Sequence, residues 1–272
     1  MYRRYITTPT PLSQVAYERI KRMIVRLDLA PGSVVREDDL QARTGVGRTP
    51  IREAVQRLER DQLLAVIPRR GLLVTSIDVS ELPLLYETRA MLEPYVHRLA
   101  ALRGTEANWR PMEQALAAVE RRGAKAGWEL LMDTDRLCHT QVWQAADNRF
   151  LTDTLDMLYT QSERLWHLYL RDAYDMHDAL DEHRQILAAL RTGDADRAAG
   201  LAEAHVRTFE ASTRSVITSR LHSPLGRAAE AAAALRNAIA NARHTPLSAT
   251  PTLTADRAEE LIADVRASRP AR

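Results

Sequence analysis

The sequence predicts a mainly α-helical protein, with an N-terminal winged helix-turn-helix domain followed by an antiparallel all-helical bundle. Three observations lead to this fold class. Apolar residues recur at helical spacing through most of the chain. Glycines separate these segments by short joints. Two short β-type runs stand next to each other near residue 70, and the β signals stop after Asp78.

The first third of the chain has the element order of a winged helix-turn-helix. A proline-glycine pair ends the first helical pattern, and a Gly-Val-Gly turn leads into the third. A basic Pro-Arg-Arg-Gly turn joins the two β-type runs into a hairpin. The expected elements are helices at about 12–28, 37–43 and 48–60 and strands at 63–67 and 72–75.

The remaining periodic segments are all helical. Thr105 and Asp194 each follow a glycine directly, so one helix ends and the next begins with a good N-cap residue. Six helices with short joints favour an antiparallel bundle. The expected helices span about 80–103, 105–122, 127–146, 149–171, 176–192 and 194–220.

Charge divides the chain in the same way. The net charge of +2 hides a basic region at 1–76, with 14 basic and 8 acidic residues, and an acidic one at 77–222, with 17 and 23. Residues 223–272 carry 7 and 5, and we expect an Ala-rich, partly ordered tail there. A basic small domain on an acidic larger one favours a polyanion-binding head and a body with another task, although chance variation in surface charge is an equal alternative from charge alone.

Several classes of protein are excluded. With 272 residues and 45% hydrophobic content, the chain is too apolar for a disordered or collagen-like protein and long enough for one or two domains. No segment predicts a signal peptide or a membrane span, so a cytoplasmic protein without membrane partners is expected. The single cysteine, Cys138, rules out an internal disulfide or a Cys-based zinc site.

The third helix and the hairpin turn present groups suited to DNA. Arg48 and Arg52 are four residues apart and share a face, while Ile51, Val55 and Leu58 form another face that can pack on a core. Arginine forms hydrogen bonds with the guanine edge and also binds phosphate. The simpler alternative is that these arginines form a solvated helix face. The candidate DNA-contacting residues are Arg48, Thr49 and Arg52 in the helix and Arg69, Arg70 and Gly71 in the turn.

Residues 12–75 resemble the GntR-type winged helix-turn-helix. The resemblance lies in the run Arg-Thr-Pro-Ile-Arg-Glu-Ala at 48–54 and in Pro-Arg-Arg-Gly-Leu at 68–72. It implies that the positions matching Arg48, Thr49, Arg52 and the wing tip contact operator DNA. Three residues depart from the family pattern at helix ends: Leu27 and Gln62 stand where glycine is usual, and Gly47 stands where a hydroxyl residue is usual.

Four residues of the acidic region suit a divalent metal. Asp135 and His139 are four apart on one helical stripe, and His183 and His205 lie on apolar faces of two later helices. A carboxylate and three imidazoles suit zinc or nickel, with positions left open for a ligand. Spacing alone leaves a second interpretation, because an inward histidine is more often a core residue than a ligand.

Residues 78–220 resemble the FCD effector domain of FadR-like GntR regulators. The resemblance rests on Leu-Tyr-Glu-Thr-Arg-Ala at 85–90, on Asp135 with His139, and on Glu-His-Arg-Gln-Ile-Leu at 182–187. It implies that Asp135, His139, His183 and His205 hold the ion, with zinc first. It also implies that Arg89 meets the carboxylate of an organic-acid effector.

The sequence therefore predicts a homodimeric DNA-binding transcription regulator, a repressor whose operator affinity responds to a small carboxylate bound near a divalent metal, and not an enzyme. Two rivals remain open. One is a metal-dependent hydrolase or isomerase with a DNA-binding anchor, against which stands the lack of a His-Glu-x-x-His motif. The other is a regulator in which the metal is purely structural or is itself the signal.

Overall fold

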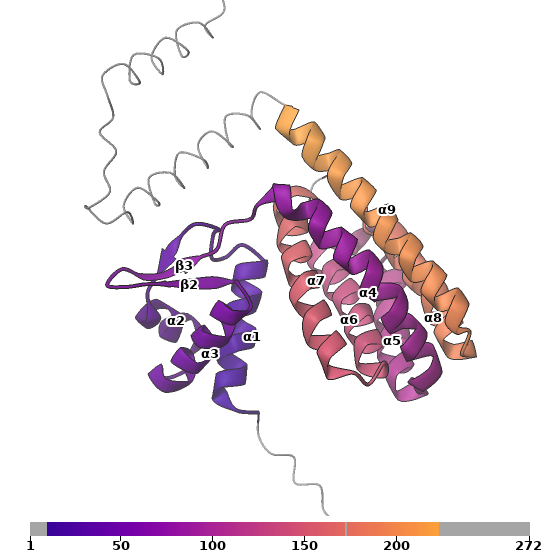
Figure 1. Cartoon of the computed structure of the whole chain (residues 1–272), viewed down its shortest axis with the longest axis horizontal. Helices are drawn as coiled ribbons and strands as arrows, with labels where there is room; N and C mark the ends of the chain where they lie inside the picture. The colour runs from indigo at the N-terminus through magenta and orange to yellow at the C-terminus, as the bar shows by residue number, and fades with distance from the viewer. Residues whose placement is uncertain (1–9, 172, 223–272) are drawn as a thin grey trace, which may run out of the picture. The chain divides into compact units, whose positions relative to one another are not determined.

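A computed structural model describes residues 10–171 and 173–222, and it confirms the predicted fold class (Figure 1). The expected tail at 223–272 lies outside the described residues. In the N-terminal part, three helices precede the hairpin and one short strand adds to it. Their bounds are α1 Leu12–Val25, β1 Val34–Val35, α2 Glu37–Thr44, α3 Arg48–Arg60, β2 Leu64–Ile67 and β3 Gly71–Val74.

The hairpin forms a three-stranded antiparallel sheet of order β1-β3-β2. Strand β1 was not predicted, because two residues are too short to show the alternation that identifies a strand. The helices pack around a separate small core in which Ile20, Ile51 and Leu58 are fully buried. Burial of one apolar face of α3 leaves its other face and its N-terminus free for another surface.

Two of the residues that depart from the GntR pattern have a left-handed backbone conformation. Leu27, after α1, has φ 64°, and Gln62, after α3, has φ 59°. A side chain in this region costs free energy that glycine avoids. At both helix ends the chain therefore adopts a left-handed turn without glycine, the residue that adopts it most easily.

Replacing Gln62 by glycine is expected to stabilise the protein. Gln62 is exposed, so little packing is lost, and the relief of strain exceeds the extra entropy that glycine gives the unfolded chain. We expect a gain of about 0.5–1 kcal/mol, or roughly 1–4 °C in Tm, by thermal unfolding. Gln62→Ala is the control; an equal gain from alanine would show that the left-handed backbone is not the cause.

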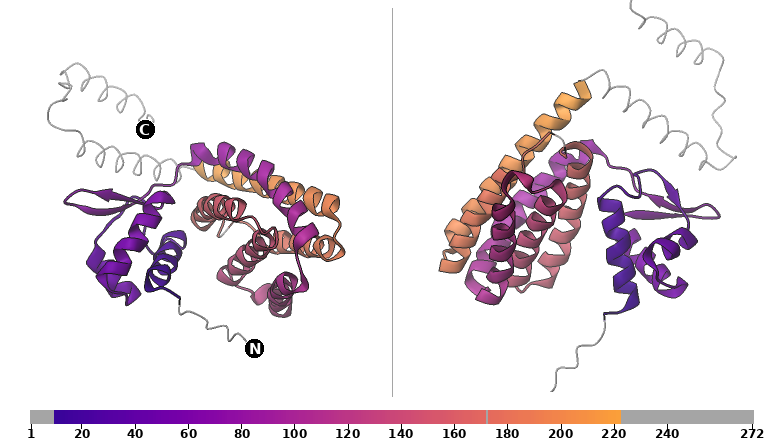
Figure 2. Two further views of the ribbon diagram at one scale, coloured as in Figure 1. Left: turned by 60° about the horizontal axis from the view of Figure 1, so that its bottom comes forward. Right: turned by 180° about the vertical axis from the view of Figure 1, so that it is seen from behind.

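The second part of the chain is a bundle of long helices. Its bounds are η1 Val79–Glu81, α4 Leu82–Arg103, α5 Glu106–Arg122, η2 Gly123–Lys125, α6 Trp128–Ala145, α7 Arg149–Tyr169, α8 His177–Thr192 and α9 Ala195–His222. Helices α4 and α9 run side by side along one face, and the remaining helices lie behind them (Figures 1 and 2). At the start of α7 the Asn148 side chain accepts hydrogen bonds from the backbone N–H groups of Phe150 and Leu151.

Polar contacts join the two parts. The Lys21 Nζ of α1 lies 2.5 Å from the Asp156 carboxylate of α7, and Arg26 lies 2.8 Å from Asp133 of α6. Arg164 of α7 donates to the backbone oxygen of Thr75. Helices α6 and α7 of the bundle therefore contact the N-terminal part directly. None of the helices described here is both long and apolar enough to cross a membrane.

Candidate metal centre and DNA-binding surface

The structure brings together all four predicted metal ligands. Asp135 and His139 come from α6, His183 from α8 and His205 from α9, and all four are buried. One potential ligand atom of each residue lies within 4.8 Å of the others. The i, i+4 spacing on α6 sets the first pair, and the antiparallel packing of α8 and α9 adds the two imidazoles.

Hydrogen bonds orient the carboxylate and one imidazole. The Asp135 Oδ1 lies 2.8 Å from Nε2 of His183, and the Tyr159 hydroxyl donates to Oδ2 over 2.5 Å. On the other side, Nδ1 of His205 lies 2.6 Å from the Glu182 carboxylate. A carboxylate that accepts from one ring nitrogen fixes the tautomer in which the other nitrogen carries a lone pair. Sequence reasoning missed Tyr159 and Glu182, although Glu182 is the direct neighbour of His183.

Several nitrogens of the cluster lack a hydrogen bond. Within the described part of the chain, neither ring nitrogen of His139 has a hydrogen-bond partner, and neither does Nδ1 of His183. A buried polar atom without a partner costs roughly 1–3 kcal/mol, so native proteins retain few of them. The Nε2 of His139 lies 3.9 Å from Asp135 Oδ2, too far for a hydrogen bond. An ion between these groups would satisfy the nitrogen, so the residues present fit a metal.

Burial also sets the protonation states that a metal requires. It lowers the pKa of His139 to about 4 and lowers the pKa of His205, so both rings are neutral at pH 7. Burial alone would raise the pKa of Asp135, but the hydrogen bond from His183 and its charge hold that pKa below the ordinary range. An ionised carboxylate and the neutral rings of His139 and His205 are ready to bind a cation without first losing protons.

Glu93 of α4 connects this cluster to Arg89. One oxygen of the fully buried Glu93 carboxylate lies 3.1 Å from Arg89 Nη2 and 3.5 Å from His139 Nδ1. Its second oxygen accepts from the Trp143 indole over 3.4 Å. The i, i+4 spacing on α4 accounts for the pairing of Glu93 with Arg89. The contact with His139 depends on how α4 meets α6, which no local pattern reveals.

Arg89 is itself buried, with 2% of its surface exposed. Its guanidinium donates to Ser162 over 3.2 Å and lies within 5.7 Å of the ring centroids of Tyr86, Tyr159 and Trp166. The Nε group has no partner among the described residues. Arg89 thus offers a free donor in an apolar, aromatic setting, where a charge-assisted hydrogen bond is stronger than in water.

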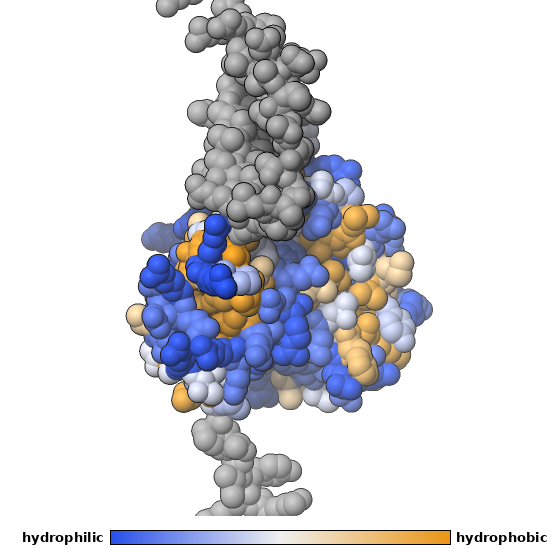
Figure 3. All heavy atoms as spheres, turned by 60° about the vertical axis from the view of Figure 1, so that its left-hand side comes forward, coloured by the Kyte–Doolittle hydropathy of each residue, from blue (hydrophilic) through white to orange (hydrophobic). Residues whose placement is uncertain are grey.

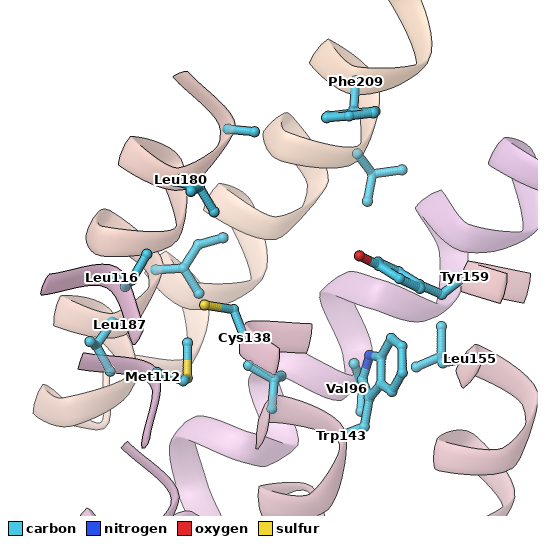
Figure 4. Close-up of a cluster of buried hydrophobic side chains, with 14 of the residues drawn as sticks. Val96, Met112, Leu116, Cys138, Trp143, Leu155, Tyr159, Leu180, Leu187 and Phe209 are labelled. Carbon is cyan, nitrogen blue, oxygen red and sulfur yellow. The ribbon is translucent and has the colours of Figure 1, made fainter. Parts of the chain in front are cut away.

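Cys138 does not belong to the cluster. Its side chain is buried, and Figure 4 shows its sulfur on the side of Leu116 and Leu187, away from Tyr159. Burial raises the pKa of the thiol well above its ordinary value, which keeps it protonated and a poor metal ligand.

The predicted DNA-contacting residues of α3 lie on the protein surface. The side chains of Arg48 and Arg52 are 66% and 57% exposed, and Thr49 is exposed between them. Glu37 of α2 lies 3.0 Å from the Arg52 guanidinium and 3.8 Å from that of Arg48. Exposed pairs of this kind contribute little free energy, so both arginines can exchange Glu37 for phosphate or a base edge.

The wing tip contains two exposed arginines and a glycine that the backbone requires. Arg69 and Arg70 are exposed in the turn between β2 and β3, where they can reach a phosphate backbone. Gly71 has φ 120°, and a Cβ there would lie 2.7 Å from the backbone oxygen of Val35. Position 71 therefore requires glycine, because β1 approaches it too closely for any side chain.

Comparison with protein families finds two matches. Residues 12–74 match the family described as bacterial regulatory proteins, gntR family, and residues 84–208 match the FCD domain. The HTH-type transcriptional repressor RspR of Escherichia coli K12 is 28% identical over 210 residues, which are 76% of this chain and 90% of the relative. The repressor GlaR of the same strain is 25% identical over 201 residues, covering 71% and 91%.

Solved structures show the same fold. McbR/YncC of E. coli superposes with a TM-score of 0.67 at 20% identity, covering 76% of this chain and 98% of that chain. A GntR transcriptional regulator from Rhodococcus sp. RHA1 superposes with a TM-score of 0.59 at 21% identity, covering 76% and 99%. At these identities the likeness concerns the fold alone.

Proposed function

Since the chain belongs to the GntR family of bacterial transcription regulators and carries an FCD domain, we propose that it is a homodimeric repressor controlled by a small organic acid bound beside a divalent metal. The observation that carries the proposal is the buried cluster of one carboxylate and three imidazoles, joined through Glu93 to Arg89. The repressor direction follows the names of the related RspR and GlaR.

The site would bind the effector through two anchors. Asp135, His139, His183 and His205 would hold Zn²⁺ or Ni²⁺, which supplies open coordination positions for a carboxylate or hydroxyl oxygen. Arg89 would pair with a second acidic group through its Nε group, which has no partner among the described residues. We assign effector and metal binding to residues 77–222 and DNA binding to residues 1–76. Two alternatives, a purely structural metal and a metal that is itself the signal, are distinguished by experiment.

A chain of ion pairs offers a route from the site to the DNA-binding part. Arg136 follows the ligand Asp135 on α6 and binds the Asp156 carboxylate of α7 over 2.8 Å. Asp156 also binds Lys21 of α1 over 2.5 Å. A change in the packing of α6 would therefore alter the position of α1, and coupling of this kind is typically worth 5- to 150-fold in affinity.

The test measures operator affinity of the full chain for a duplex selected from a random pool. Affinity is measured for metal-free protein, for protein with Zn²⁺, and for protein with Zn²⁺ and each member of a panel of small hydroxy acids. We expect one acid to lower operator affinity at least about 5-fold, and only with metal present. A change with Zn²⁺ alone would identify the metal as the signal, whereas constant affinity throughout would contradict the effector half of the proposal.

Asp156→Asn provides the matched variant for the same assay. It removes the charge that links Arg136 to Lys21, and we expect it to reduce the ratio of operator affinities with and without effector. Asp153→Asn, on the exposed surface of the same helix, is the control and should leave that ratio unchanged. An unchanged ratio in Asp156→Asn would show that the signal takes another route.

A further inference from the structure

Helix α4 presents an apolar stripe on its outer face. Leu84, Met91, Tyr95 and Leu102 are 65%, 72%, 52% and 67% exposed, and they account for four of the nine large hydrophobic residues exposed in the described chain. Figure 3 shows orange apolar groups among blue and white ones on one face of the molecule. Scattered exposed apolar residues are ordinary, but several of them aligned along one helix face mark an interaction surface.

The spacing of the stripe is that of a helix pair. Its apolar members follow one another at intervals of seven, four and seven residues, and the exposed Thr88 and Arg98 fill the two intermediate positions. Together they make the alternating three- and four-residue steps of a heptad seam. The opposite face of the same helix is buried in the bundle with Arg89 and Glu93.

The stripe is also symmetric about position 93. Leu84 and Leu102 each lie nine residues from that position, and Met91 and Tyr95 each lie two residues from it. An isologous two-fold contact places the same patch of two copies face to face. Two antiparallel α4 helices with their axis at position 93 would therefore set Leu84 against the second copy's Leu102, and Met91 against its Tyr95.

Charge agrees with this register. Thr88 and Arg98 each lie five residues from position 93, so they face each other in the antiparallel pair. Glu87, next to Thr88 and exposed, then lies beside the second copy's Arg98, whose guanidinium also binds the exposed Asp196 of its own chain. The two-fold axis repeats this complementary contact. A parallel pair would instead set Arg98 against Arg98, with like charges in the seam.

We infer that a second copy of this chain covers the stripe, with the two α4 helices antiparallel and centred on position 93; the inference rests on the homodimer of the proposed function. It makes α4 a shared element, because its inner face holds Arg89 and Glu93 while its outer face joins the protomers. A shift of α4 on effector binding would then change the separation of the two DNA-binding parts.

Disulfide crosslinking tests the register. We expect the double variant Leu84→Cys with Leu102→Cys to form a covalent dimer on mild oxidation of the full chain. Each single variant alone should stay uncrosslinked, because in this register position 84 lies 18 residues, or about 27 Å, along the helix from its own copy. Mixing the two single variants should restore crosslinking. The native Cys138 is buried, so the wild-type chain serves as the background.

The outcomes separate this inference from the proposed function. Light scattering of the same samples reports the oligomeric state. A dimer that crosslinks through Leu84→Cys alone would overturn the antiparallel register. A dimer without any crosslink at these positions would overturn the α4 interface and leave the homodimer standing. If deletion of residues 223–272 then produced the crosslink, that segment and not a second copy would cover the stripe in the full chain, which would also overturn the inference. A monomer would overturn both.

Discussion

Replacing His183 by glutamine should lower the affinity of the protein for Zn²⁺ by at least about 100-fold. His183 lies 2.8 Å from Asp135 and belongs to the cluster of four ligand atoms, so its loss removes a direct ligand. Replacing a residue that hydrogen-bonds to a metal ligand typically lowers metal affinity about 10- to 100-fold. Replacing a ligand itself should lower the affinity more. Competition with a chromophoric chelator at pH 7.5 measures the affinity, and metal content after dialysis provides a second measurement.

His97→Gln is the matched control. His97 is as buried as His183 and lies near the same cluster, but it contacts the backbone oxygen of Glu93 rather than Asp135. We expect this variant to retain Zn²⁺ affinity within about a factor of 10, the lower end of the outer-partner effect. Equal losses in the two variants would show that the cluster responds to packing damage, and unaltered affinity in His183→Gln would contradict the proposed ligand set.

The stability of the same variants addresses the role of the ion. If the metal is structural, removal from the wild-type chain lowers Tm sharply, and His183→Gln has the low Tm even with excess Zn²⁺. If the metal serves the effector, removal lowers Tm only by the modest amount that binding free energy contributes, and operator binding survives. Thermal unfolding with and without a chelator distinguishes the two.

The clustering of these four residues was predictable because each of them is marked by its local sequence pattern. Asp135 and His139 share a helical stripe by spacing alone, and His183 and His205 each stand out on an apolar face, where a polar residue is unusual. Short joints between the helices made the antiparallel bundle the expected arrangement. The structure confirms the predicted helices, with ends that differ by up to three residues.

The surroundings of the site were not predictable, because they depend on which helices meet and at what height. Tyr159 reaches Asp135 from α7, and Glu93 reaches His139 from α4. No sequence motif fixes the spacing between Tyr159 and Asp135 or between Glu93 and His139. The helices α6 and α7 are joined by a turn, and α5 lies between α4 and α6 in the chain. Strand β1 escaped prediction for the opposite reason: the pattern was local but only two residues long.

Replacing Arg48 or Arg52 by alanine should lower operator affinity by about 10- to 100-fold, the cost of one lost base or phosphate contact. Both side chains are exposed on α3, and their contacts with Glu37 in the free protein are weak. Fluorescence anisotropy with the selected duplex measures the affinity of the full chain. Arg60→Ala removes the same charge from the other end of α3, about 18 Å away, and should change affinity less than either.

Salt dependence then assigns a role to each arginine. A residue that binds phosphate releases a counterion, so its loss should reduce the slope of log K against log salt by about one while weakening all duplexes alike. A residue that reads a base should leave the slope nearly unchanged and relax the preference at one position of the duplex. The two outcomes can differ between Arg48 and Arg52, because Arg48 lies in the first turn of α3 and Arg52 lies one turn later. Operator affinity as strong as wild-type in both variants would exclude α3 as the helix that contacts DNA.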